Sequence, residues 1–257
     1  MSVIDAVTAQ DTAAPAVFRA IQILELLSHA RRTMTVTEIA VEIPLAKSSV
    51  SNLLSTLEAT GMVRRTAAGW LVGYKALEIG QSVLAATDLV SEFKRIASTL
   101  THLSKDTALL AVLDGMDVLY LARHDGVQPV RLASDIGRRL PASVTSLGQS
   151  MLASLSPEEL ERRLALVDVL PRPTERSPKT KDDLRRELVR VRERGFAIDD
   201  EQNTIGVTCF GVALPGLTEP IAVSTTLLSQ RITKELADQL VADLTVLAHQ
   251  LALFVKS

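Results

Sequence analysis

The chain has 257 residues, of which 47% are hydrophobic and 3% aromatic, so it is long enough for one large domain or two ordinary ones with packed cores. Its 28 lysines and arginines nearly balance its 30 aspartates and glutamates. The net charge of -2 excludes a polycation, so any contact with nucleic acid must come from a local patch.

Cysteine usage and the chain ends indicate the compartment. Cys209 is the single cysteine, so an internal disulfide cannot form, and cysteine and histidine do not fall at zinc-ligand spacing. Residues 1–14 lack the basic start and apolar core of a signal peptide. His249 and Gln250 interrupt the apolar C-terminal segment, and no run of 18 apolar residues occurs. We expect a soluble cytoplasmic protein with a disordered tail at residues 1–14, no metal and no cofactor.

Residues 15–74 begin with two predicted helices. The first helix is marked by apolar residues at the spacing of one helix face, namely Val17, Ala20, Ile21, Leu24 and Leu27. The second helix starts at the motif TVTE (residues 35–38), where Thr35 and a glutamate three positions later form a capping box, and it ends at Pro44.

A third helix is predicted over residues 47–60, with Gly61 suited to the left-handed residue that ends a helix. Its buried stripe is Val50, Leu53, Leu54 and Leu57. At 100° per residue the opposite face carries Ser48, Ser51, Asn52 and Ser55. The segments MVRR, TAAG and WLVG that follow predict a small hairpin. Three helices and a hairpin make a winged helix-turn-helix.

The rest of the chain has a mixed pattern. Residues 75–88 are predicted to form a linker helix, and residues 89–257 a second domain. In that domain TALLAVLDGMDVLYLARH predicts two strands around the turn DGMD, further strands are expected at 207–214 and 221–226, and a last helix begins near Thr233. Antiparallel strands with flanking helices predict an α+β fold.

The polar face of the third helix has the chemistry of a DNA-reading surface. Short hydroxyl and amide groups can enter the major groove, and Asn52 can pair with adenine at two positions. For any one of these serines alone the alternative is an ordinary solvated helix surface, but the helices, the cap and the wing together favour DNA binding. The predicted DNA-binding residues are Thr35, Lys47, Ser48, Ser49, Ser51, Asn52, Arg64 and Arg65.

Three segments resemble the IclR family of bacterial transcription regulators: VFRAIQILELLSH, VTEIAVEIPLAKSSVSNLLSTLEATGMVRR and GFAIDDEQNTIGVTCFGVALPG. The likeness covers residues 17–257, and its downstream part is the more specific, because many winged helix proteins share the N-terminal pattern. The resemblance implies a winged helix, a linker helix and a GAF-like effector domain. It also implies dimers, often paired into tetramers, on palindromic operator DNA, with repression of a catabolic operon as the commoner role.

A sensing domain needs a small cavity with convergent polar groups. Thr145 and Ser146 lie at a predicted helix N-terminus, which favours an anion, and Ser224 and Thr226 share one face of a strand. The resemblance marks Leu132, Ser146, Asp199, Cys209, Ser224 and Thr226 as pocket positions, with Leu109, Ala111 and Leu121 as the apolar wall. Without the resemblance, Cys209 would be a plain buried residue and Asp199 the cap of a turn.

The chain departs from the family pattern at two positions of this predicted site. Ser143 stands where the family commonly has histidine, and Gln149 stands in place of the lysine of a GK pair. Charged or imidazole groups are thus replaced by neutral ones. We therefore expect a less anionic ligand, or one held differently, than the small acids that many relatives bind.

Two other functions remain open on the sequence. One is an enzyme with Cys209 as nucleophile, which would need a nearby base such as His102, His124 or His249. None of these histidines has a catalytic sequence setting, and VTCFGV has the pattern of a strand interior, where a thiol is inert. The other is a module whose winged helix binds protein. A DNA-binding regulator that is not an enzyme is the function the sequence favours.

Overall fold

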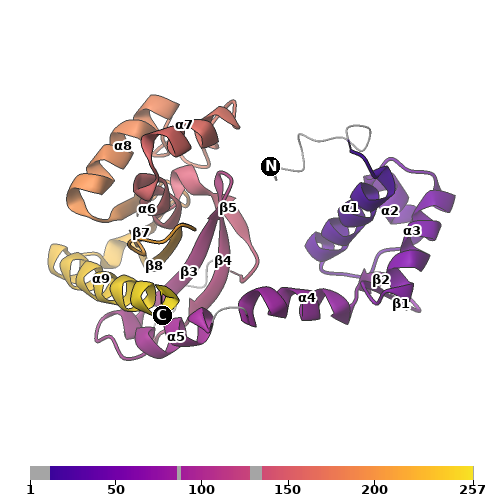
Figure 1. Ribbon diagram of the computed structural model, residues 1–257, viewed down its shortest axis with the longest axis horizontal. Coiled ribbons are helices and arrows are strands. Elements are labelled where there is room, and N and C mark those ends of the chain that lie inside the picture. The colour runs from indigo at the N-terminus through magenta and orange to yellow at the C-terminus, as the bar shows by residue number, and fades with distance from the viewer. Residues whose placement is uncertain (1–11, 86–87, 128–134, 257) are drawn as a thin grey trace. The chain divides into compact units, whose positions relative to one another are not determined.

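The computed structural model describes residues 12–85, 88–127 and 135–256 (Figure 1). Contacts divide the chain into two compact units, Met1–Ala86 and Thr87–Ser257. Of the tail expected at residues 1–14, residues 1–11 lie outside the described residues.

The first unit contains the predicted helices and the wing. Val50 and Leu54 of α3, together with Ile23 and Ile39 of the two preceding helices, are fully buried, because they occupy the apolar stripe of each helix. Trp70 of β2 packs on this core. The elements in chain order are α1 (Pro15–Ala30), α2 (Val36–Glu42), α3 (Lys47–Ala59), β1 (Val63–Thr66), β2 (Gly69–Val72) and α4 (Tyr74–Ala85).

The hairpin β1–β2 is held to the helices by a short backbone bridge. Met34 and Trp70 exchange two hydrogen bonds, of 3.0 and 2.8 Å, just before α2 begins. Gly69 has a φ of +137°, and a Cβ at this position would lie 2.6 Å from the carbonyl oxygen of Met34. Glycine is therefore required where the turn meets the bridge.

The second unit is a six-stranded antiparallel sheet in the order β5-β4-β3-β8-β7-β6, with helices on both faces (Figure 1). Its helices are α5 (Leu89–Ala97), α6 (Ser146–Ser154), α7 (Pro157–Ala165), α8 (Lys181–Arg194) and α9 (Lys234–Lys256). Its strands are β3 (Thr107–Asp114), β4 (Asp117–His124), β5 (Arg139–Pro141), β6 (Ala197–Asp200), β7 (Val207–Ala213) and β8 (Ile221–Leu228). Short 3-10 turns precede β3 and α6 and follow β8.

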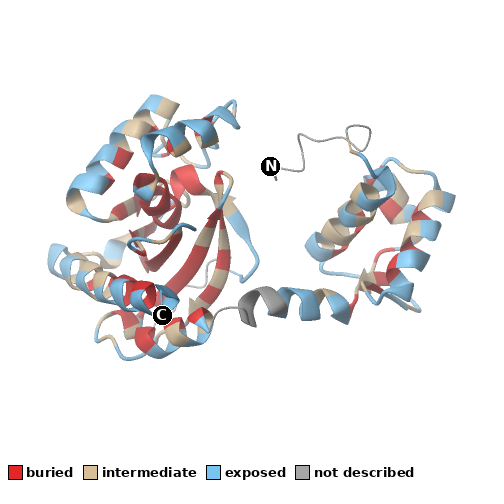
Figure 2. Ribbon diagram, viewed as in Figure 1, coloured by how far each residue is buried: buried red, intermediate tan, exposed pale blue. Residues whose placement is uncertain are grey.

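The two faces of the sheet belong to two separate cores. Because side chains alternate along a strand, Leu110 of β3 packs with α5 and α9, whereas Leu109 packs with α6 and α8. Both cores are seen as buried segments on either side of the sheet in Figure 2. The N-terminal helical unit and this α+β domain confirm the expected fold class.

The C-terminal helix α9 is long and apolar enough to span a membrane by length and composition alone. In this fold, six of its residues are buried in the core that it shares with α5 and the sheet, namely Leu240, Leu244, Leu247, Ala248, Leu251 and Ala252. Its apolar character is therefore explained by packing within the second unit.

Candidate functional site

The outward face of α3 is polar and exposed. Ser48, Ser51 and Asn52 are exposed on the side opposite the buried Val50 and Leu54. This division follows from the 100° step of the helix, which turns residues two apart to opposite sides. The surface predicted to read DNA is thus free for contact in this unit.

The start of α3 offers backbone donors beside a cation. Its N-cap residue is Ala46, which has no side-chain acceptor for the first-turn N–H groups. Lys47 is exposed at this end, and Ser49 is half-buried. Open amides and a lysine at a helix N-terminus suit a phosphate oxygen.

The two arginines of β1 lie on different faces of the wing, since neighbouring residues of a strand point to opposite sides. The guanidinium of Arg64 lies 5.1 Å from the ring centroid of Tyr74. That of Arg65 lies 5.7 Å from the ring centroid of Trp70, on the side of the hairpin that faces the helices. Aromatic rings therefore orient both exposed cations.

Thr35 has a structural task at the start of α2. Its hydroxyl oxygen accepts a hydrogen bond from the Glu38 N–H at 3.3 Å, and the Thr35 N–H donates to the Glu38 carboxylate at 2.7 Å. The hydrogen bond from the Thr35 backbone and the one from Arg32 lower the pKa of Glu38 to about 2. The predicted capping box is confirmed, and a DNA contact by Thr35 would have to share its hydroxyl with the cap.

In the second unit the predicted effector residues meet on the sheet face beneath α6. Asp199 of β6 pairs with Cys209 of β7, which pairs in turn with Thr226 of β8. The thiol of Cys209 donates to the Thr226 hydroxyl, with Sγ 3.4 Å from Oγ1. Ser224, in the next cross-strand row, is also buried. The register of three strands thus brings four predicted positions together.

Helix α6 lies directly on this row of strands. A Cβ on Gly211 of β7 would stand 2.5 Å from the carbonyl oxygen of Ser146, and one on Gly148 would stand 2.2 Å from Cα of Ala142. Two glycines therefore permit backbone contact on both sides of the helix start. Thr145 caps the helix, because its hydroxyl accepts from the Gly148 N–H at 3.1 Å.

A chain of hydrogen bonds joins α6 to Asp199 through Gln202. The Gln149 Nε2 donates to the carbonyl oxygen of Ser143 at 2.9 Å and to Oε1 of Gln202 at 2.6 Å. The N–H groups of Gln202 and Asn203 donate to Oδ1 of Asp199 at 2.7 and 3.1 Å. Among the residues that the structure describes, two buried atoms of this region have no hydrogen-bond partner, Ser143 Oγ and Gln149 Oε1.

Burial controls the titration of this cluster. Burial raises the pKa of Asp199 to about 7, although the N–H groups of Asn203 and Gln202 favour the carboxylate. Burial also raises the pKa of the Cys209 thiol, and the charge of Asp199 adds to this effect. The pKa of Tyr120 is raised by burial and by the proximity of Cys209 and Asp199, which adds Tyr120 of β4 to the cluster. A thiol that stays protonated is a poor nucleophile.

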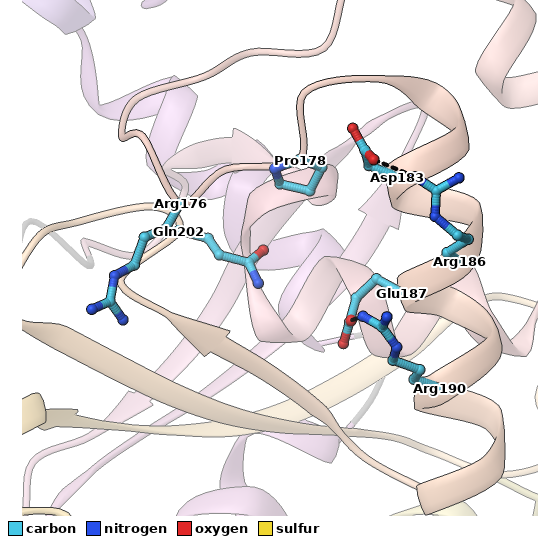
Figure 3. A pocket seen from close by; sticks show the side chains of 7 residues that line it. All are labelled: Arg176, Pro178, Asp183, Arg186, Glu187, Arg190 and Gln202. Atoms are coloured by element: carbon cyan, nitrogen blue, oxygen red, sulfur yellow. Dashed lines mark hydrogen bonds and ion pairs between the residues drawn. The ribbon is translucent and has the colours of Figure 1, made fainter.

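A hollow of about 370 Å³ lies on the outer side of Gln202 (Figure 3). It is lined by Arg176, Pro178, Asp183, Arg186, Glu187, Arg190 and Gln202. Figure 3 shows Gln202 opposite the α8 side chains, with Asp183 joined to Arg186 and Glu187 to Arg190.

The loop before α8 holds the turn that carries Gln202. Thr174 Oγ1 donates to the carbonyl oxygens of Glu201 and Gln202, and Ser177 Oγ donates to that of Gln202 at 2.7 Å. Arg176 binds the carboxylate of Asp200 at 2.6 Å. This loop therefore fixes the turn beside Asp199.

The apolar wall differs from the expectation. Leu109 and Ala111 are buried on the α6 side as predicted, but Leu121 packs against the core of α5 and α9. An irregularity in the pairing of β3 with β4 lets Ala111 pair with Tyr120 and Leu110 with Ala122, so Leu121 has no cross-strand partner on β3. Leu132 lies outside the described residues.

Sequence reasoning missed Tyr120 and Gln202, and it treated Ser143 and Gln149 only as departures from a pattern. The alternation of side chains along β4 could have indicated Tyr120, because it places this residue on the same face as Val118. Gln202 lies in a turn, and no sequence pattern indicated it. Among the described residues no group of three or more histidines, cysteines, aspartates or glutamates could hold a metal ion.

Comparison with known families decides the identity. Residues 81–253 match the family model described as bacterial transcriptional regulator IclR C-terminal, and residues 16–67 match the IclR helix-turn-helix domain. The chain belongs to the IclR family. As an IclR-family protein it is a DNA-binding transcriptional regulator and not an enzyme.

Curated relatives and a solved structure agree with this IclR assignment. The chain is 31% identical over 199 residues to the transcriptional regulator XynR of Escherichia coli K12, covering 76% of this chain and 77% of that one. It is 27% identical over 200 residues to the transcriptional repressor IclR of the same organism, covering 76% and 73%. An IclR homologue from Microbacterium hydrocarbonoxydans in complex with 4-hydroxybenzoate shares the fold, with a TM-score of 0.74 at 21% identity over 92% of this chain and 98% of that one.

Proposed function

We propose that this IclR-family regulator binds a palindromic operator as a homodimer, with α3 in the major groove and the wing against the phosphate backbone. The observation that carries the proposal is the division of α3, in which Val50, Leu54 and Leu57 are buried while Ser48, Ser51 and Asn52 are exposed. A single helix reads only a few base pairs, and two-fold pairing doubles these contacts and adds a spacing requirement.

The proposed contacts divide into two kinds. Asn52, Ser51 and Ser48 read base edges, because amide and hydroxyl groups match the donors and acceptors of the major groove. The remaining predicted residues hold the backbone and fix the register of the helix, and they are Thr35, Lys47, Ser49, Arg64 and Arg65.

The second unit is proposed to bind a small organic metabolite that alters operator affinity. The polar cluster beneath α6, formed by the buried Asp199, Ser224 and Thr226 with the half-buried Cys209, supports this role, because convergent polar groups in an apolar setting are typical of ligand sites. The remaining proposed positions are Leu109, Ala111, Thr145 and Ser146. The complex of a homologue with 4-hydroxybenzoate is in keeping with such a site.

Repression of a catabolic operon is the proposed direction of control. A relative named as a transcriptional repressor, 27% identical to this chain, supports repression. From the resemblance to the family we also propose that two dimers pair into a tetramer. The proposed compartment is the cytoplasm.

The test is binding of the full-length protein to the DNA upstream of its own gene across a salt series. We expect a sequence-specific complex whose logarithmic affinity falls linearly with the logarithm of salt concentration, because phosphate contacts release counterions. A matched control is Lys94→Ala in α5, which removes an exposed lysine from the second unit and leaves α3 unchanged. Binding that ignores both sequence and salt would favour a protein-interaction module instead.

A further inference from the structure

We propose that the buried cluster beneath α6 takes an uncharged small molecule that donates hydrogen bonds through N–H or O–H groups, and that it discriminates against carboxylates. This inference rests on the proposed effector role of the second unit and specifies the ligand class. Gln149 is the residue that determines the preference.

Gln149 presents an unpaired acceptor inside the protein. Its side chain is fully buried, and Oε1 has no hydrogen-bond partner within the described ranges. The amide orientation is fixed, because Nε2 donates to the carbonyl oxygen of Ser143 and to Oε1 of Gln202, and rotation would place oxygen against oxygen. A buried acceptor left unpaired destabilises the protein, and a ligand N–H or O–H relieves that cost.

Two other residues of the same hydrogen-bond chain, Ser143 and Asp199, can also accept hydrogen bonds, although the Ser143 hydroxyl can donate as well. Ser143 Oγ is buried and also has no partner in the described part of the chain. Asp199 uses Oδ1 for the N–H groups of Gln202 and Asn203, and an ionised carboxylate can only accept. A ligand with donor groups therefore finds several complementary atoms.

The described side chains that form this cluster, namely those of Asp199, Cys209, Tyr120, Ser143 and Gln149, include no cation, although the charge of Arg138 reaches Tyr120 and favours its ionised form. The titratable groups that face it from the sheet are Asp199, Cys209 and Tyr120. Helix α6 has the sequence SLGQSMLAS, without a charged residue, and the preceding residues 142–145 are also uncharged. Above about pH 7, where Asp199 is ionised, a second carboxylate here would meet its charge in a buried setting.

The positive end of the α6 dipole is too weak to balance the charge of a buried carboxylate. The dipole at a helix start favours an anion only weakly in ordinary settings, whereas burying an unpaired ion is much more costly. The Thr145 hydroxyl already accepts from the Gly148 N–H, which removes one of the donors at the start of α6. A neutral ligand avoids the larger cost.

The outer hollow borders the cluster at one side chain. Gln202 lines the hollow and also accepts a hydrogen bond from Gln149 (Figure 3). The guanidinium groups around the hollow are occupied, because Arg176 pairs with Asp200, Arg186 with Asp183 and Arg190 with Glu187. Each of these cations is thereby already neutralised by a neighbouring carboxylate.

The experiment measures binding of matched pairs of compounds to the full-length protein by calorimetry and ligand-observed NMR. Each pair joins a carboxylic acid with its primary amide, such as lactate with lactamide and 4-hydroxybenzoate with 4-hydroxybenzamide, extended by neutral ureas and polyols. At about pH 8, where the acids are ionised, the amide of a pair should bind at least about tenfold more tightly. Tighter or equal binding of the acids overturns the proposal, and so does a failure of every neutral compound to bind.

Two variants locate the preference at Gln149. Gln149→Lys supplies a cation and should reverse the order within each pair, while Gln149→Leu keeps the bulk, removes the acceptor and should abolish the discrimination without favouring the acids. If Gln149→Lys does not fold, comparing the binding preference of the wild type with that of Gln149→Leu still tests the proposal. Unchanged preference in Gln149→Leu assigns the selectivity elsewhere and contradicts the proposal.

The binding measurement contains no DNA, so the two proposals fail in different ways. If the amides bind and operator affinity does not respond, the effector role is wrong and the ligand class stands. If operator affinity responds to carboxylates that bind more tightly than their amides, the effector role stands and the ligand class is wrong.

Discussion

Asn52 is the exposed side chain of α3 with two hydrogen-bonding groups that match adenine. We predict that Asn52→Ala relaxes base preference at one position of each half-site and weakens specific binding by about 1–3 kcal/mol. Competition between the operator and single-base variants measures both effects. Glu58→Ala, at the exposed C-terminal end of the same helix, is the control. Unchanged base preference in Asn52→Ala would remove this residue from base reading.

The two wing arginines are predicted to differ because they lie on different faces of the hairpin. Arg65, on the face toward the helices, should contact phosphate, so Arg65→Ala should weaken binding to all sequences alike and reduce the salt slope by about 1. Arg64→Ala, on the Tyr74 side, should reduce the slope less, and Lys94→Ala in α5 is the control because it lies in the second unit. Equal salt slopes for wild type and Arg65→Ala would contradict the assignment.

The buried carboxyl of Asp199 predicts a pH-dependent stability. Burial raises its folded pKa from 3.8 to about 7, so between these values the folded chain keeps a proton that the unfolded chain has lost. The free energy of unfolding therefore falls as pH rises through this window and levels off above it. Asp199→Asn keeps the oxygen that accepts from Gln202 and Asn203, and it should be more stable than wild type at about pH 8 by roughly 2–4 kcal/mol.

Urea unfolding of both Asp199 proteins between about pH 4 and pH 8 checks this prediction. The difference between them should grow with pH, because only the wild type has the carboxyl. A difference that is the same at both ends of the range would show that burial does not control this group.

At the scale of elements, the cap of α2 is the local interaction with the clearest stability effect. Thr35→Ala removes the hydroxyl that accepts from the Glu38 N–H and should lower the free energy of unfolding of the first unit by about 1 kcal/mol. Thr35→Ser retains an acceptor and is the control. Chemical unfolding followed by Trp70 fluorescence reports on this unit, because Trp70 packs in its core. Equal stability of the alanine and serine variants would argue against the cap.

Most elements could be predicted from the sequence, because helices and strands leave periodic patterns of apolar residues. Helix α3 was expected at residues 47–60 and spans Lys47–Ala59. Leu121, placed in the apolar wall through the resemblance, lies on the other face of the sheet, because the irregular pairing of β3 with β4 shifts the alternation along β4. Asp199, Cys209 and Thr226 were named together through a resemblance, but their adjacency depends on strand register, which no local pattern of these residues encodes.

At the scale of the whole molecule, the proposed ligand site and the helix proposed to read DNA belong to different compact units. Any effect of a ligand on DNA must therefore act through a change in the equilibrium between arrangements of the molecule. We predict that the true effector changes operator affinity about 5- to 150-fold, which corresponds to a coupling of roughly 1–3 kcal/mol. Operator titrations with and without the ligand measure this, and Thr226→Val, which leaves the Cys209 thiol without its acceptor, should weaken the response. No change in wild-type affinity would exclude the mechanism.

The net charge of the whole chain does not indicate that a protein of this kind binds DNA. A net charge of -2 over 257 residues gives no indication of DNA binding, whereas the first unit places Lys47, Arg64 and Arg65 at exposed positions. A small number of cations suffices, because phosphate contacts supply most of the non-specific affinity.

Backbone meets backbone where α6 rests on Gly211, and no side chain cushions that junction. Because a close-packed interior has low compressibility, we expect a ligand that widens this junction to displace α6 or β7 as a rigid element.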